Sequence, residues 1–143
     1  MSNLLYLLDS NVVSELRKAS TGKADHKVLA WAATVPVQAL RLSVISVMEI
    51  ELGIRLLERR DNRQAEHLRV WLNTILLPAF AGRILNIDLD VAMTCASLHV
   101  PDPRPERDAL IAATAVVHGT SLVTRNTRDF AGLAVQLINP WQQ

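Results

Sequence analysis

The sequence contains few of the features that define several protein classes. Cys95 is the only cysteine among 143 residues, which excludes an internal disulfide and argues against a cysteine-based zinc site. A lone thiol is typical of a reducing compartment, so we expect a cytoplasmic protein. The longest wholly apolar stretch is the six residues 28–33, far shorter than a membrane-spanning helix. Asp9 interrupts the apolar run at 4–8, so no signal peptide is predicted and no membrane partner is expected.

The sequence also lacks a large excess of charge of either sign. Fifteen Lys and Arg residues are balanced by fourteen Asp and Glu residues, so the formal net charge is +1. Such a chain is not held to nucleic acid by bulk charge, so a nucleic-acid partner would require a local basic patch. Aromatic residues make up only 4%, which leaves the core to Leu, Val, Ile and Ala. The length predicts one domain spanning residues 1–143.

Short apolar runs alternate with segments of helical periodicity along the whole chain. This alternation predicts a three-layer α/β/α sandwich around a central, mostly parallel five-stranded sheet. The predicted strands are 4–8, 40–44, 84–87, 121–124 and 134–138, and the predicted helices are 12–21, 28–35, 45–57, 68–75, 89–100 and 108–118. The helices around 45–57 and 68–75 are predicted to form an antiparallel hairpin whose apolar residues are candidates for a dimer or partner surface.

Two acidic residues occur at expected element boundaries. Asp9 follows the first predicted strand, and in open α/β sheets ligands bind at the carboxyl ends of strands. A helix N-cap would also explain Asp9. Asp108 begins an alanine-rich helix, where the helix dipole alone favours a carboxylate by roughly 0.3–1 kcal/mol. Its face is shared by Ala112 and Ala115, whose small side chains would let this helix approach the sheet closely.

Glu49 lies on an otherwise apolar helical face with Ile45, Met48 and Leu52. An ionised carboxylate on a core face is unfavourable unless it is paired or binds a metal. A salt bridge to an arginine is therefore the alternative to a metal site, whereas Glu51, about 200° around the helix, is expected to face water.

Taken together, Asp9, Glu49 and Asp108 could meet in one cleft. Clustered carboxylates raise one another's pKa, and a divalent cation relieves that conflict. Oxygen ligands suit Mg²⁺, with Mn²⁺ as an alternative, rather than zinc. Such a site is suited to phosphodiester hydrolysis.

Six segments carry a resemblance to a known family. The chain resembles PIN-domain ribonucleases of the VapC toxin type, and their FitB-like branch in particular. The matching segments are 7–15 (LLDSNVVSE), 42–53 (LSVISVMEIELG), 77–85 (LPAFAGRIL), 107–115 (RDALIAATA), 123–130 (VTRNTRDF) and 139–141 (NPW). They cover nearly the whole chain in the family's order.

The resemblance implies a doubly wound α/β/α fold, often dimeric, that cleaves RNA, often tRNA. It also implies a VapB-type antitoxin partner, with DNA bound only through that antitoxin. It assigns Asp9 and Asp108 as metal ligands and Glu49 to the same catalytic site. Many relatives carry a fourth acid where this chain has Asn126, so either Asn126 or Asp129 takes that place.

Other residues leave alternatives open. Four arginines near Asp108 and the fourth strand are candidates for RNA binding: Arg104, Arg107, Arg125 and Arg128. The four histidines show no ligand spacing. The rival hypothesis is a non-catalytic PIN-fold module that acts with an antitoxin on operator DNA. A metal-dependent DNA nuclease is a third possibility, because the chemistry does not distinguish the sugars.

Overall fold

A five-stranded parallel sheet forms the centre of the molecule. The computed structural model describes residues 4–142. The strands are β1 (Tyr6–Leu8), β2 (Leu40–Ser43), β3 (Ile84–Leu85), β4 (Ser121–Val123) and β5 (Leu137–Ile138). They lie in the order β3-β2-β1-β4-β5, and all four pairings are parallel. The central strand is therefore β1, and its carboxyl end lies between those of β2 and β4.

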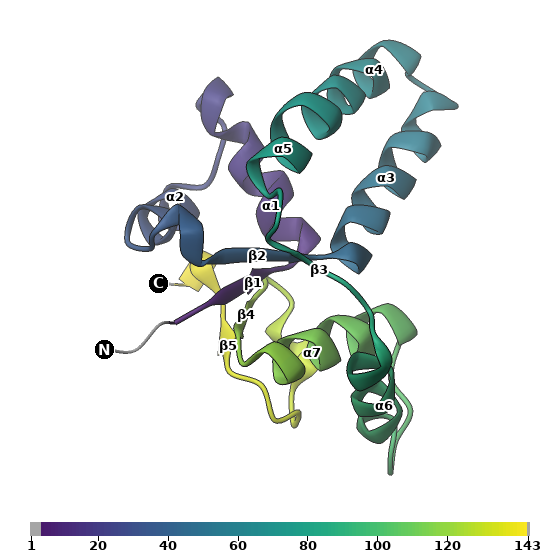
Figure 1. Ribbon diagram of the computed structural model, residues 1–143. Coiled ribbons are helices and arrows are strands. Elements are labelled where there is room, and N and C mark those ends of the chain that lie inside the picture. The colour runs from purple at the N-terminus through teal and green to yellow at the C-terminus, as the bar shows by residue number, and fades with distance from the viewer. Residues whose placement is uncertain (1–3, 143) are drawn as a thin grey trace.

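Helices cover both faces of this sheet (Figure 1). One face carries α1 (Ser10–Arg17), α2 (His26–Ala33), α3 (Val44–Glu58), α4 (Asn62–Trp71) and α5 (Leu77–Ala79), and the other carries α6 (Leu89–Leu98) and α7 (Glu106–His118). The predicted three-layer sandwich is confirmed, and the sheet is parallel throughout. Among residues 4–142, no helix is long and apolar enough to cross a membrane.

Alternation along β1 divides the core between the two faces. Successive strand residues point to opposite sides. Leu8 is 1% exposed and packs with Val12 and Ile54 beneath α1 and α3. Leu7 is fully buried and packs with Ala112 and Ala115 of α7. The alanines let α7 lie close to the sheet, as its composition predicted.

Several element boundaries differ from the prediction. The first and fifth strands are shorter than predicted and span only Tyr6–Leu8 and Leu137–Ile138. The second helix of the hairpin, α4, begins at Asn62 instead of residue 68. Asp61 caps it, because its carboxylate accepts a hydrogen bond from the backbone N–H of Gln64. Helix α7 begins at Glu106, so Asp108 lies within the first turn.

The prediction of which α3 residues are buried is also corrected. Met48 and Leu52 are 44% and 37% exposed, so they are not core residues. Glu51 does not simply face water. Its carboxylate accepts hydrogen bonds from Arg69 of α4 and from Arg55, so it ties the two helices of the hairpin together.

Candidate active site

Asp9 lies at the carboxyl end of β1, on the sheet edge where β2 and β4 also end. Its backbone N–H donates to Val123 O at 2.9 Å. One carboxylate oxygen accepts from the Ser10 N–H at 2.8 Å and so caps α1, and the other accepts from the Thr124 hydroxyl at 2.8 Å. Asp9 is 7% exposed. It is thus a helix cap, as the simpler interpretation held, and it is also held rigidly at the sheet edge.

Glu49 is brought to the same place by α3, which begins directly after β2. The Ser10 hydroxyl donates to Glu49 Oε1 at 3.2 Å. The guanidinium of Arg107 lies 3.5 Å from Glu49 Oε2. The expected alternative, a salt bridge to an arginine, is therefore present. The arginine comes from α7, next to Asp108, so this ion pair connects both faces of the sheet at the site.

Electrostatics link these side chains to one another. Burial is the main cause that raises the pKa of Asp9, Glu49 and Asp108. The carboxylates of Asp9 and Asp108 raise the pKa of Glu49 further, and Asp9 does the same to Asp108. Arg107 lowers the pKa of Glu49 and Asp108. Three buried or half-buried carboxyl groups therefore lie close enough to affect one another's pKa. Within the part of the chain that the structure describes, Arg107 is the one arginine whose charge lowers the pKa of any of them.

The sequence left two candidates for the fourth position, Asn126 and Asp129. Asp129 lies in a short 3-10 turn, Thr127–Phe130, where no side-chain cap forms. Its carboxylate raises the pKa of both Asp9 and Asp108. Asn126 contributes a backbone N–H that donates to the Thr124 hydroxyl at 3.0 Å. The negative charge of Asp129 therefore reaches the site.

The four candidate RNA-binding arginines have different surroundings. Arg107 pairs with Glu49. Arg104 donates to the carbonyl of Ala131 at 3.1 Å, and the Arg125 guanidinium lies 5.1 Å from the centre of the Trp141 ring. Arg128 is exposed. Arg107 is thus the arginine placed directly at the acidic cluster.

A pocket of about 250 Å³ lies beside Glu49, between α1, α3 and α4. Ser14 and Arg17 of α1 line one wall, and Ile50, Gly53 and Trp71 are among the residues of the other walls. The Arg17 guanidinium lies 5.9 Å from the centre of the Trp71 ring. The pocket combines an apolar floor, a cation and hydroxyl groups next to the acidic cluster.

Sequence reasoning missed two groups of residues. Thr124 and Ser10 fix the carboxylates of Asp9 and Glu49, and no pattern in the sequence marks that role. Cys95 and His99 were set aside as a lone thiol and an ordinary histidine. His99 is the C-cap residue of α6, so its spacing of four from Cys95 places both side chains on the same face, and that spacing was the available signal.

The chain belongs to the PIN domain family, whose model matches residues 6–135. It is 37% identical to the VapC ribonuclease Y4jK of Sinorhizobium fredii, over 96% of this chain and 99% of that protein. It is 34% identical to toxin FitB of Neisseria gonorrhoeae, over the same shares of each chain. A solved structure of FitAB bound to the IR36 DNA fragment superposes with a TM-score of 0.85 at 33% identity, covering 96% of both chains.

Proposed function

We propose that the chain is a Mg²⁺-dependent endoribonuclease and the toxin component of a VapBC-type toxin–antitoxin pair. The observation that carries this proposal is the convergence of Asp9, Glu49 and Asp108 at the carboxyl ends of the central strands, with burial raising the pKa of each carboxyl group. The similarity to proteins named ribonuclease and toxin supports it.

The donor set fits a hard divalent cation. Asp9 and Asp108 would be its direct ligands, and Glu49 would complete the site directly or through a water. Mn²⁺ suits the same oxygen ligands. When bound, such a cation lowers the pKa of a coordinated water and offsets negative charge on the scissile phosphate. Asp129 is proposed as the fourth acid, in place of Asn126, because its charge reaches Asp9 and Asp108.

The other residues of the site have positioning roles in this proposal. Thr124 and the backbone of Ser10 hold the Asp9 carboxylate, and the Ser10 hydroxyl holds Glu49. Arg107 can exchange its ion pair with Glu49 for a substrate phosphate, because its side chain is 49% exposed. The pocket beside Glu49 would receive a nucleotide next to the scissile bond, with Arg17 facing a phosphate and Trp71 a base.

Cleavage of RNA in the presence of Mg²⁺ tests this function, with tRNA as the first substrate. We expect Asp9→Asn and Asp108→Asn to lower the cleavage rate by about 100-fold or more, since loss of a group needed for water activation typically costs 10²–10⁴-fold. Asparagine preserves the cap geometry at residue 9. Asp90→Asn, an exposed acid on α6, is the matched control and should cleave like the wild type. Equal activity in all four proteins would contradict the assignment.

Partners follow from the same proposal. We expect inhibition by a VapB-type antitoxin, DNA binding only through that antitoxin, and a homodimer in solution. The pocket between α1, α3 and α4 is where an inhibitor would cover the acidic cluster. Light scattering should give twice the 15.8 kDa chain mass.

A second candidate function is a non-catalytic module that acts with its antitoxin on operator DNA. The similarity to a structure named for FitAB on a DNA fragment favours it. It predicts DNA binding by the two-protein complex and no cleavage of RNA or DNA at any Mg²⁺ concentration. Cleavage of a DNA oligonucleotide in the same assay would instead indicate a DNA nuclease.

A further inference from the structure

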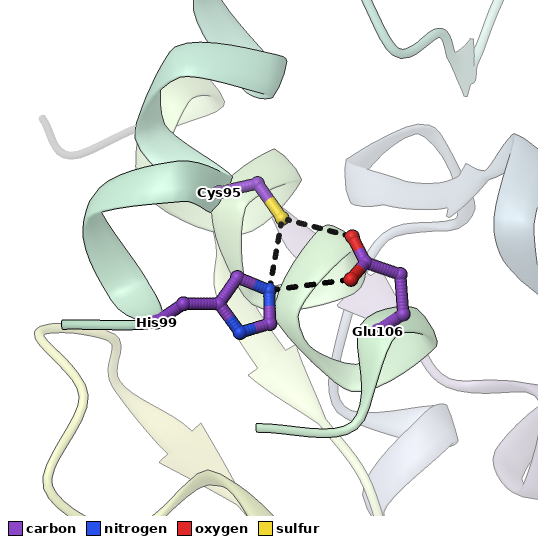
Figure 2. A group of neighbouring side chains, drawn as sticks. All are labelled: Cys95, His99 and Glu106. Carbon is purple, nitrogen blue, oxygen red and sulfur yellow. Dashed lines mark hydrogen bonds and ion pairs between the residues drawn. The ribbon is translucent and has the colours of Figure 1, made fainter. Parts of the chain in front are cut away.

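Three side chains converge where α6 ends and α7 begins, apart from the acidic cluster (Figure 2). Cys95 lies on α6, His99 is the C-cap residue of that helix one turn later, and Glu106 begins α7. Cys95 Sγ is 3.8 Å from His99 Nε2 and 3.8 Å from Glu106 Oε1. His99 Nε2 is 3.5 Å from Glu106 Oε2. One sulfur, one nitrogen and one carboxylate oxygen thus form a triangle of ligand atoms.

The size of this triangle matches a tetrahedral zinc site. With Zn–S near 2.3 Å and Zn–N and Zn–O near 2.0–2.1 Å, tetrahedral angles separate sulfur from nitrogen or oxygen by about 3.5 Å, and nitrogen from oxygen by about 3.3 Å. Each distance in the structure is only slightly longer. A side-chain movement of about 0.3 Å would therefore close the triangle around a cation.

The burial of the three groups allows a cation to enter. The Cys95 residue is 4% exposed and lies at the base, the His99 side chain is 23% exposed, and the Glu106 side chain is 73% exposed at the rim. Glu106 and Asp108 are two residues apart on α7, about 200° around the helix, so they project from different faces. The triangle is thus distinct from the acidic cluster that contains Asp108.

We propose that Cys95, His99 and Glu106 form a second cation site, selective for a borderline transition metal such as Zn²⁺, with one open coordination position. Thiolate and imidazole are ligands that Mg²⁺ does not favour, so the two sites differ in metal as well as in place. This site is independent of the proposed nuclease function.

Binding at this site requires protons to move. Burial, reinforced by the Glu106 carboxylate, raises the pKa of the Cys95 thiol, so the thiol is protonated before the cation arrives. His99 Nδ1 accepts a hydrogen bond from the backbone N–H of Arg104 at 3.1 Å, so neutral His99 carries its proton on Nε2. On binding, the thiol proton leaves to solvent and the imidazole proton moves to Nδ1. About one proton is therefore released per cation, and the Arg104 hydrogen bond breaks.

The position of the site gives it a structural consequence. It joins the last turn of α6 to the first turn of α7, and that turn carries Arg107 and Asp108. Arg104 leads into this turn and also contacts Ala131. A bound cation therefore holds the beginning of α7 through side chains and releases the backbone of Arg104 from His99.

Titration of the reduced protein with Co²⁺, followed by displacement with Zn²⁺, tests the proposal. We expect a thiolate-to-cobalt charge-transfer band that saturates at about one Co²⁺ per chain with release of about one proton. Cys95→Ser, His99→Gln and Glu106→Gln should each weaken Zn²⁺ binding, measured by competition with a chelator, by about tenfold or more. His118→Gln, an exposed histidine at the end of α7, is the matched control and should bind like the wild type.

Two further measurements separate this site from the acidic cluster and from misfolding. The double variant Asp9→Asn, Asp108→Asn should keep the cobalt band, and circular dichroism should give the same helical signal for every variant. A wild-type protein without the band would overturn the proposal. The same holds if Zn²⁺ affinity depends on Asp9 and Asp108 while Cys95→Ser and His99→Gln bind as the wild type does.

Discussion

Asp129 shows how a single residue gains its role from its surroundings. In the sequence it is one of two candidates for the fourth position, and the other, Asn126, stands where the family resemblance places the acid. In the structure the 3-10 turn Thr127–Phe130 carries Asp129 to where its carboxylate raises the pKa of Asp9 and Asp108. No local pattern predicts this, because the effect depends on residues about 20 and 120 positions away.

We predict that Asp129→Asn lowers the affinity for Mg²⁺ by about tenfold, within the 10–100-fold range found when groups that support metal ligands are removed. The physical reason is that the negative charge of Asp129 adds to the attraction of the site for a cation. Isothermal titration with Mg²⁺ measures this. Asn126→Ala is the paired variant. It removes no charge, so it should change the affinity less than threefold, which corresponds to less than about 1 kcal/mol. A reversed order would assign the fourth position to Asn126.

At the scale of secondary structure, the α3–α4 hairpin is where sequence periodicity was least reliable. A helical spacing of apolar residues identified α3, but it did not identify which apolar residues are buried. Ile54 is 2% exposed, whereas Met48 and Leu52 face outward. Periodicity defines a stripe, and tertiary packing decides which part of the stripe is covered.

Gly53 lowers the stability of this hairpin, and substitution can test that effect. It lies inside α3 and lines the pocket beside Glu49, and a Cβ built there meets no atom within 4 Å. We predict that Gly53→Ala stabilises the protein by about 0.5–1 kcal/mol, since alanine loses less backbone entropy than glycine in a helix. Thermal unfolding should show a rise in Tm of roughly 2–4 °C. Gly82→Ala is the contrasting variant, because a φ of 79° disfavours a Cβ and should lower Tm.

For the whole molecule, the important property is that the acidic site exists only in the folded chain. Its carboxylates come from the loop after β1, from α3 and from α7, which are separated by about a hundred residues in sequence. The parallel sheet order brings them together, because β1 lies between β2 and β4. A cation bound there therefore has no comparable site in the unfolded chain.

We therefore predict that Mg²⁺ at a hundred times its Kd stabilises the fold by about 2.7 kcal/mol, as expected for a ligand that binds only the native state. The rise in Tm should be roughly 5–10 °C. The double variant Asp9→Asn, Asp108→Asn should show no such rise. An equal rise in the variant would indicate that Mg²⁺ binds elsewhere. Limited proteolysis of the same samples tests the prediction that residues 1–143 form a single domain.

The sequence by itself determined the layered α/β/α architecture, the near order of the elements and the family, because alternating apolar runs and caps act locally. It also singled out Asp9, Glu49 and Asp108 as candidate site residues, since each stands at a boundary or on a face where a carboxylate needs an explanation. Only the tertiary structure decided how they are held, by Thr124, Ser10 and Arg107. It also brought Asp129 to the cluster and joined Cys95 and His99 to Glu106. Those contacts span separate elements, and the packing of those elements sets the distances on which charge and ligand geometry depend.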